Sequence, residues 1–392
     1  MTHTNAEKMI KNAPVSDYPD DLAQILEELG NPHRNIGIIK VCGDSGKSSV
    51  CTLLSSVLSA AGLKTGRLVT PFIHSIADSI CIYEKPISID FFSKSADKVY
   101  KAINRIKKSR SENVSFEPGM YSVLYAVAFV AFCDAGCDHA VIEIPGDSLS
   151  HTALTSPVLS VISSVHSIES TQKICSRLDR NSKEVVCAVQ SREIYKLISD
   201  KCAETNTRLS MPIKNSFCFM SSAVKHMEFT YRGTPYSSGC GAYYQTHNLL
   251  TVLEATEALR RLGIRITGTD ICSAVLCEGI PLRFEIISVM PTIIVDRADT
   301  PDKRKAFLDT LKKLEGQISK TPTVICEKNS NSISDEFLSI NLHAKSLETT
   351  EKELKKQLRS LCGELSEDST LIVLGSSEYC ETAAKLIKEA LM

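Results

Sequence analysis

Short apolar segments alternate with helix-length segments along the first part of the chain. The apolar segments have the length of strands and read NIGIIKVCG, LKTGRLVT, HAVIEIPG and VLSVISSV. Between them lie the longer segments SSVCTLLSSVLSAAG and GMYSVLYAVAFVAFCDAG. Continuous apolar strands separated by helices are typical of a parallel sheet covered on both faces. The pattern therefore predicts a doubly wound, mostly parallel α/β domain.

The same alternation begins again after residue 285. The strand-like segments PTIIVD, PTVICE and STLIVLGS are separated by the helical segments KRKAFLDTLKKLEG and TTEKELKKQLRSLCGEL. Upstream, QTHNLLTVLEATEALRRLG has apolar residues at helical spacing and a glycine where a C-terminal cap belongs. We predict two domains, residues 1–285 and residues 286–392, of which the second is a smaller, Rossmann-like α/β domain.

Composition and charge narrow the classes of function. The 392 residues include 45 Lys and Arg against 46 Asp and Glu, a net charge of -1 that attracts neither nucleic acid nor an anionic membrane. No apolar run has the roughly 20 residues that a bilayer crossing requires. The 15 cysteines are scattered, with no CxxC pair and no zinc spacing, so we interpret them as reduced thiols. We expect a cytoplasmic monomer that binds neither nucleic acid nor membrane.

The segment IIKVCGDSGKSSVCTLL has the order of a phosphate-binding turn, with an apolar strand, a Gly-rich loop and the start of a helix. Its loop reads GDSGKSS, which is shorter than the full Walker pattern because Val41 replaces the first glycine. Glycines let backbone N–H groups approach phosphate oxygens, and the helix N-terminus adds partial positive charge. We predict that this loop binds ATP; the alternative is an ordinary strand-to-helix turn with a solvated lysine. The candidate nucleotide-binding residues of the loop are Gly43, Ser45, Gly46, Lys47, Ser48 and Ser49.

This loop and further segments resemble the Mur ligase superfamily, and within it the folylpolyglutamate synthase and dihydrofolate synthase branch. The matching segments follow the family's order along almost the whole chain: LGNPHRNIGIIKVCGDSGKSSV, AGLKTGRLVTPFIHSIADSICIYEKPIS, VSFEPGMYSVLYAVAF, AVIEIPG, YQTHN, PLRFE, VDRADTP and LIVLGS. Most matches are individually weak, and their shared order makes the resemblance specific. It implies a phosphate-loop central domain followed by a smaller C-terminal α/β domain.

The resemblance also implies an activity. Enzymes of this branch use ATP to phosphorylate a carboxylate, and the amine of an amino acid then attacks the acyl phosphate. For this chain, it implies ATP and Mg²⁺ as cofactors, and a folate-like carboxylate and an amino acid such as glutamate as substrates.

The resemblance further implies roles for single residues. Lys47 and Ser48 would lie at the β- and γ-phosphates, with Lys47 also a candidate catalytic residue. Thr70 stands where the family has a magnesium-binding serine, and Glu143 matches its magnesium-binding glutamate. Ser48, Thr70 and Glu143 are therefore the candidate magnesium ligands, and hydroxyl and carboxylate oxygens suit this ion.

Three further positions match residues that the family places near the nucleotide. Asn248 and Arg283 match such residues, and Asp296 matches the aspartate that helps to close the second domain over ATP. Arg283 is also a candidate catalytic residue, because an arginine can stabilise charge on a phosphoryl group in transfer. The alternatives are a helix N-cap for Asn248 and ordinary surface salt bridges for Arg283 and Asp296.

The chain departs from the family at the second metal site. The family's Asp-His pair is replaced by Ile168 and Glu169, and Glu169 is a candidate catalytic residue because its carboxylate can still supply an oxygen to a hard cation. The family's metal-binding lysine, usually carbamylated, aligns with Leu178, which cannot bind a metal. Lys183 would replace it only if the loop were rebuilt.

Three functions are therefore consistent with the sequence. The first is an active ATP-dependent amide ligase. The second is an ATP-binding pseudoenzyme, or a relative with an altered substrate, that has lost the second metal site. The third is an ATPase or phosphotransferase, which needs only the first magnesium ion and a water or hydroxyl acceptor.

Overall fold

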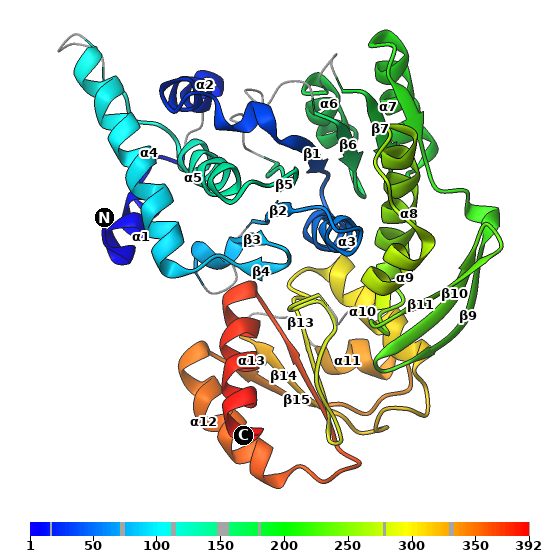
Figure 1. Ribbon diagram of the computed structural model, residues 1–392. Coiled ribbons are helices and arrows are strands. Elements are labelled where there is room, and N and C mark those ends of the chain that lie inside the picture. The colour runs from blue at the N-terminus through cyan, green and yellow to red at the C-terminus, as the bar shows by residue number, and fades with distance from the viewer. Residues whose placement is uncertain are drawn as a thin grey trace. The chain divides into compact units, whose positions relative to one another are not determined.

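The computed structural model describes residues 1–15, 18–70, 75–110, 115–146, 157–178, 182–276, 280–328 and 333–391 (Figure 1). The chain forms two compact units, each assembled from two segments. Unit 1 comprises Met1–Pro212 and His247–Ala274, and unit 2 comprises Ile213–Thr246 and Val275–Met392. The predicted domains, residues 1–285 and 286–392, are not tested by this division and stay a prediction.

Unit 1 contains an eight-stranded sheet in the order β4-β3-β2-β5-β1-β6-β7-β8. The strands from β2 to β8 in this order are parallel, and β3 and β4 form an antiparallel edge. The bounds are β1 (Gly37–Cys42), β2 (Thr65–Leu68), β3 (Ile80–Ile82), β4 (Lys85–Pro86), β5 (His139–Glu143), β6 (Leu159–Ile162), β7 (Glu184–Cys187) and β8 (Arg208–Ser210). The predicted doubly wound, mostly parallel α/β fold is confirmed.

The helices of unit 1 follow the predicted alternation with the strands. They are α1 (His3–Lys11), α2 (Pro19–Glu28), α3 (Lys47–Ala60), α4 (Ile89–Ser109), α5 (Met120–Ala135), α6 (Ile168–Ser176), α7 (Arg192–Glu204), α8 (Gln245–Arg261) and α9 (Gly268–Leu276). The unit boundaries fall within the last two of these helices, so unit 1 includes α8 from His247 onward and α9 up to Ala274. Short 3₁₀ turns lie at Pro32–Asn35 and Ala77–Ser79. None of the described helices is long and apolar enough to cross a membrane.

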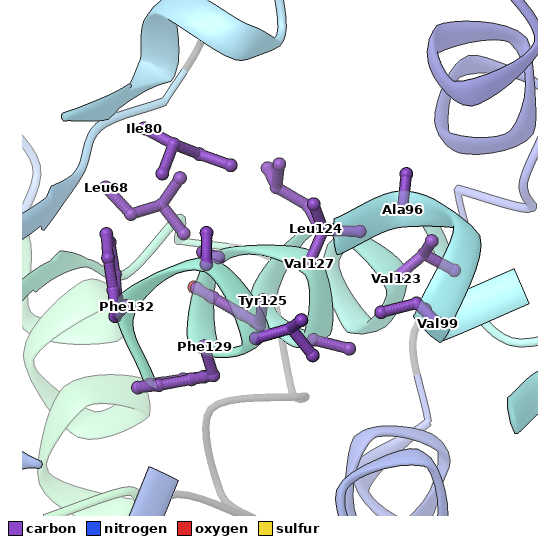
Figure 2. Close-up of a cluster of buried hydrophobic side chains, with 14 of the residues drawn as sticks. Leu68, Ile80, Ala96, Val99, Val123, Leu124, Tyr125, Val127, Phe129 and Phe132 are labelled. Atoms are coloured by element: carbon purple, nitrogen blue, oxygen red, sulfur yellow. The ribbon is translucent and has the colours of Figure 1, made fainter. Parts of the chain in front are cut away.

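The largest core of unit 1 surrounds α5, which is apolar on all sides and therefore buried on all sides. In Figure 2, Val123, Leu124 and Phe132 of α5 lie among side chains of α4, β2 and β3. The helix ends at Gly136, whose left-handed φ of 70° forms the C-terminal cap. This core fixes β2 and β5, the two strands that lead into Thr70 and Glu143.

Unit 2 contains a five-stranded sheet in the order β12-β13-β16-β14-β15, with β12 antiparallel to β13 and the other pairs parallel. A separate antiparallel sheet has the order β11-β10-β9. The strand bounds are β9 (Phe217–Ala223), β10 (His226–Tyr231), β11 (Thr234–Ser238), β12 (Glu285–Val289), β13 (Thr292–Asp296), β14 (Thr323–Glu327), β15 (Lys345–Thr349) and β16 (Thr370–Leu374). The helices are α10 (Pro301–Lys313), α11 (Ile333–Leu338), α12 (Glu351–Glu364) and α13 (Ser377–Leu391), with a 3₁₀ turn at Lys214–Ser216. The alternating α/β pattern is confirmed, and the antiparallel sheet is an element that the sequence did not predict.

The register of the parallel strands brings three strand ends together in unit 1. Val41 of β1 pairs with Glu143 of β5, and Cys42 pairs with Ile162 of β6. The loops that follow β1, β5 and β6 therefore leave the same edge of the sheet side by side. In open parallel sheets, ligands bind at this edge.

Candidate active site

The phosphate loop joins β1 to α3 and depends on two glycines. Gly43 has a φ of 133°, and Gly46, the N-cap of α3, has a φ of 85°. A Cβ atom at Gly43 would lie 2.2 Å from the hydroxyl oxygen of Ser163, and one at Gly46 would lie 2.3 Å from Oδ1 of Asn248. Both positions exclude other residues by conformation and by space. The loop thus presents the N-terminus of a 14-residue helix, where backbone N–H groups favour an anion.

Lys47 begins α3 and folds back over the loop. Its Nζ atom donates to the carbonyl oxygen of Gly43 at 2.9 Å and to that of Asp44 at 3.4 Å. This position holds the ammonium group above the helix N-terminus, so both contribute positive potential to the same place. ATP binding by this loop stays a prediction.

Ser48, Thr70 and Glu143 are brought together by α3 and by the ends of β2 and β5. The Ser48 hydroxyl donates to Oε2 of Glu143 at 2.9 Å, and the backbone N–H of Thr70 donates to the same oxygen at 3.2 Å. Glu143 and Thr70 are 3% and 5% exposed, so both lie away from bulk water, and these two donors help to hold the carboxylate in place. Two hydroxyls and a carboxylate are hard oxygen donors of the kind that Mg²⁺ prefers. The three predicted ligands of the first magnesium ion fit that ion.

A segment that sequence reasoning missed supports the loop from the side of β6. The carbonyl oxygen of Ser164 accepts from the N–H groups of Asp44 and Ser45 at 2.9 and 3.1 Å. The Asp44 carboxylate accepts from the His166 N–H at 2.7 Å, and the Ser45 hydroxyl lies 2.7 Å from His166 Nε2. His166 therefore contacts the loop through both its backbone N–H and its ring. Its contact partners are about 120 positions away in sequence, and no local pattern indicates such a pair.

Asn248 and Ser49 complete the described surroundings of the loop in unit 1. Asn248 lies in the first turn of α8, which begins at Gln245, so its interpretation as the helix N-cap is wrong. Its side-chain oxygen instead faces Gly46, as the glycine contact above shows. Ser49 is 3% exposed and lies in the first turn of α3.

Asp296 and Arg283 belong to unit 2, and Asp296 is a buried group at the end of β13. Its Oδ2 atom accepts from the Tyr244 hydroxyl at 2.6 Å and from the Phe284 N–H at 2.7 Å. Burial raises the pKa of Asp296 to about 6, although these hydrogen bonds and the positive charge of Arg283 act in the opposite direction. Arg283 itself donates to the carbonyl oxygen of Arg297 at 3.4 Å. Because Asp296 is 3% exposed, its interpretation as a surface salt-bridge residue is wrong.

Glu169 does not join the other candidate residues of unit 1. It lies in the first turn of α6 with its side chain 78% exposed, and it pairs with Lys173 at 2.8 Å, which lowers its pKa. Leu178 packs against the apolar cluster formed by residues of β6, β7 and α7. Among the residues that the structure describes, no group of three or more His, Cys, Asp or Glu side chains could hold a metal ion. Among the described residues, neither the exposed Glu169 nor Leu178 supplies a second metal site.

Comparison with solved structures defines the fold class. The apo form of the folylpolyglutamate synthase of L. casei superposes with a TM-score of 0.85 at 21% identity and covers 100% of both chains. A complex of folylpolyglutamate synthase with AMPPCP and folate gives a TM-score of 0.81 at 20% identity, again over 100% of both chains. The two-unit α/β architecture is therefore that of folylpolyglutamate synthase, as the resemblance implied.

Comparison of sequences points to the same enzymes. No protein-family model matches the chain. The folylpolyglutamate synthase of Lacticaseibacillus casei is 24% identical over 331 residues, covering 79% of this chain and 76% of that protein. The dihydrofolate synthetase of Saccharomyces cerevisiae is 32% identical over 123 residues, 31% of this chain and 27% of the yeast protein. The chain thus spans about a quarter of the yeast relative and about three quarters of the bacterial one, and the predicted resemblance to this branch is confirmed.

Proposed function

We propose that this protein is an ATP-dependent amide ligase that joins glutamate to a folate-like carboxylate. The observation that carries the proposal is the phosphate loop with its oxygen ligands, set in a chain that is similar to a folylpolyglutamate synthase over 331 residues. A chain that had kept only the fold would not require Ser48, Thr70 and Glu143 to converge beside the loop.

The proposed reaction has two steps. A carboxylate oxygen of the folate-like substrate attacks the γ-phosphorus of ATP, and ADP leaves. The amine of glutamate then attacks the acyl carbon, the amide bond forms and inorganic phosphate leaves. The overall reaction consumes one ATP and yields ADP, phosphate and the amide.

Residues of unit 1 bind and orient the nucleotide in this proposal. Backbone N–H groups from Gly46 to Ser49, at the start of α3, would surround the phosphates, and Lys47 would add a positive charge at the terminal ones. Ser48, Thr70 and Glu143 would hold Mg²⁺, which supplies charge neutralisation at the phosphate oxygens. Asn248 lies beside Gly46 and lines the same loop.

Residues of unit 2 complete the proposed set. Arg283 keeps the proposed role that the resemblance implies, which is to stabilise charge on the transferring phosphoryl group, and Asp296 contributes a carboxylate at the end of β13. Glu169, also predicted from the sequence as catalytic, is exposed and paired with Lys173, and the proposal assigns it no role. A cytoplasmic monomer that binds neither nucleic acid nor membrane remains the prediction made from the sequence.

Calorimetry with ATP and Mg²⁺, followed by an ADP-release assay in the same sample, tests the proposal. ADP release that requires a folate or dihydropteroate together with glutamate, and that is lost in Lys47→Ala, is the expected result. ATP binding without release under any substrate condition would instead identify a pseudoenzyme. Release without an amino acid would identify an ATPase or phosphotransferase, and absence of ATP binding would refute the assignment of the loop.

A further inference from the structure

A cavity lies at the edge of the eight-stranded sheet that is opposite to the phosphate loop. Its walls come from α2, from the turn at Pro32–Asn35 and from the amino-terminal ends of three strands, with Gly37 in β1, Val158 just before β6 and Lys183 just before β7. The phosphate loop follows the other end of β1. With a rise of about 3.3 Å per residue, the two ends of this six-residue strand are roughly 17 Å apart. The cavity is therefore separate from the candidate active site.

The size and lining of the cavity suit a small molecule. Its volume is about 780 Å³. Sites for small molecules have roughly 300–1,000 Å³, and they combine apolar walls with a few polar groups. The walls here include the apolar side chains of Leu26, Ile36 and Ile38 and the amide side chains of Asn31 and Asn35. The cavity can therefore hold a ligand much larger than a single ion.

Three charged side chains lie in the described walls: Glu27 of α2, Arg34 and Lys183. All three residues are exposed. In the part of the chain that the structure describes, none of their side chains forms an ion pair or a hydrogen bond, either with one another or with another residue. Two positive charges and one negative charge are thus available to a ligand.

His33 adds a buried polar group to the wall. It is 9% exposed, and its ring packs edge-on against Phe129 of α5 with the ring centroids 5.9 Å apart. Its Nδ1 atom has no hydrogen-bond partner among the described residues. A buried polar atom without a partner costs roughly 1–3 kcal/mol, so such an atom requires an explanation. A polar ligand in the cavity would supply the partner that the described chain does not.

The charges of the walls complement those of an acidic amino acid, which carries two carboxylates and one ammonium group. Arginine binds a carboxylate through two parallel hydrogen bonds, and lysine attracts it as a point charge. We infer that this cavity is a second binding site, for glutamate or a short acidic peptide with a free amino group, whose carboxylates bind Arg34 and Lys183 and whose ammonium group binds Glu27. A ligand in this place is too far from the phosphate loop to react there. The inference does not depend on the proposed function, because it rests on the size and charges of the cavity.

Calorimetry of the full chain without ATP or folate tests the site, with L-glutamate and triglutamate as separate probes. We expect binding that Arg34→Gln and Lys183→Met each weaken about tenfold or more, and that Arg34→Lys partly restores. Lys196→Met, at an exposed position of α7, is the matched control and should change nothing; circular dichroism checks folding. Tighter binding of triglutamate supports a peptide ligand, and tighter binding of L-glutamate supports the free amino acid. If neither probe binds, or if Arg34→Gln and Lys183→Met bind both probes as tightly as the wild type, the site does not exist.

The N-acetyl form of the tighter probe, which lacks the ammonium group, tests the role of Glu27. Acetylation should weaken binding to the wild type about tenfold and should have no effect on binding to Glu27→Gln. An equal effect of acetylation on both proteins would overturn the assignment of Glu27.

The ADP-release assay on the same preparations separates this inference from the proposed function. Arg34-dependent binding of a probe to a wild-type chain that releases no ADP would refute the proposed ligase and leave the second site intact. Substrate-dependent ADP release without Arg34-dependent binding would overturn the second site and leave the ligase intact.

Discussion

Replacing Asp296 with asparagine removes a charge from the interior of unit 2 while preserving the shape of the side chain. Asp296 is 3% exposed, and the Tyr244 hydroxyl and the Phe284 N–H both donate to the same carboxylate oxygen. An asparagine carbonyl can accept both hydrogen bonds. The substitution therefore changes mainly the ability of the group to ionise.

The size of the effect follows from the pKa. Burial raises the pKa of Asp296 from 3.8 to about 6 in the folded state. Between these values the folded protein binds more protons than the unfolded chain, so the contribution of Asp296 to the free energy of unfolding falls as pH rises. A shift of this size corresponds to about 3 kcal/mol. The stabilising contribution is fully present below about pH 4 and is lost above about pH 6.

We expect Asp296→Asn to become more stable relative to the wild type as pH rises from 4 to 7, by up to about 3 kcal/mol. Urea titrations of the full chain, followed by far-ultraviolet circular dichroism at several pH values, measure the difference. Asp368→Asn, at an exposed position of the same unit, is the control. If the two units unfold separately, the transition of unit 2 carries the effect.

Because His33 also changes its protonation between pH 4 and 7, the difference in stability between Asp296→Asn and the wild type is more informative than the pH profile of either protein alone. Burial lowers the pKa of His33 from 6.5 to about 4, so its contribution is present above pH 6.5 and is lost as pH falls to 4. This dependence has the opposite sign and a similar size of about 3 kcal/mol, and it masks that of Asp296 in the wild type. The His33 contribution is the same in the wild type and in Asp296→Asn, so it cancels when the two proteins are compared. Parallel profiles of Asp296→Asn and wild type between pH 4 and 7 would refute the reasoning about Asp296.

Three other substitutions test the loop and the sheet. Gly43→Ala should abolish detectable ATP binding in calorimetry, because Gly43 has a φ of 133° and lies close to the Ser163 hydroxyl. Gly62→Ala, with a φ of 81° and open space around it, should cost about 1–2 kcal/mol of stability and leave ATP binding unchanged. Equal effects of the two substitutions on ATP binding would contradict the steric argument. Glu143→Gln should weaken the magnesium-dependent part of ATP binding by about tenfold or more, measured with and without Mg²⁺, and an unchanged magnesium dependence would remove Glu143 from the proposed ligands. Arg261→Met should destabilise unit 1 by about 3 kcal/mol in urea titrations, because the buried Glu184 carboxylate loses its contacts with the Arg261 guanidinium at 2.6 and 3.2 Å. A loss of stability below about 1 kcal/mol would show that solvent screens this ion pair like a surface pair.

The loop could be predicted because its signal is local, whereas Thr70 and Glu143 became candidate magnesium ligands through the family resemblance. The strand β1, the two glycines and the start of α3 are consecutive in sequence, and the order of strand, turn and helix is itself the pattern. Glu143 ends an apolar strand, where a carboxylate requires an explanation. In the structure, Thr70 and Glu143 converge because they lie at or just beyond the ends of neighbouring parallel strands.

Other contacts depend on residues that are distant in sequence and have no local signal. His166 and Ser45 meet only because β6 pairs with β1. The strands β9, β10 and β11 were missed because they are partly exposed and mix apolar with polar residues, so that they lack the continuous buried runs of the parallel strands.

The sequence by itself determined the alternation of strands and helices, the phosphate loop and the family resemblance, because apolar periodicity and glycine positions act on neighbouring residues. Only the tertiary structure decided where the charged groups lie. It placed Arg34 and Lys183 around one cavity at the edge opposite to the loop, buried Asp296 against Tyr244, and left Glu169 on the surface. Burial and charge depend on which strands pair and which helix covers them, and no short stretch of the chain contains that information.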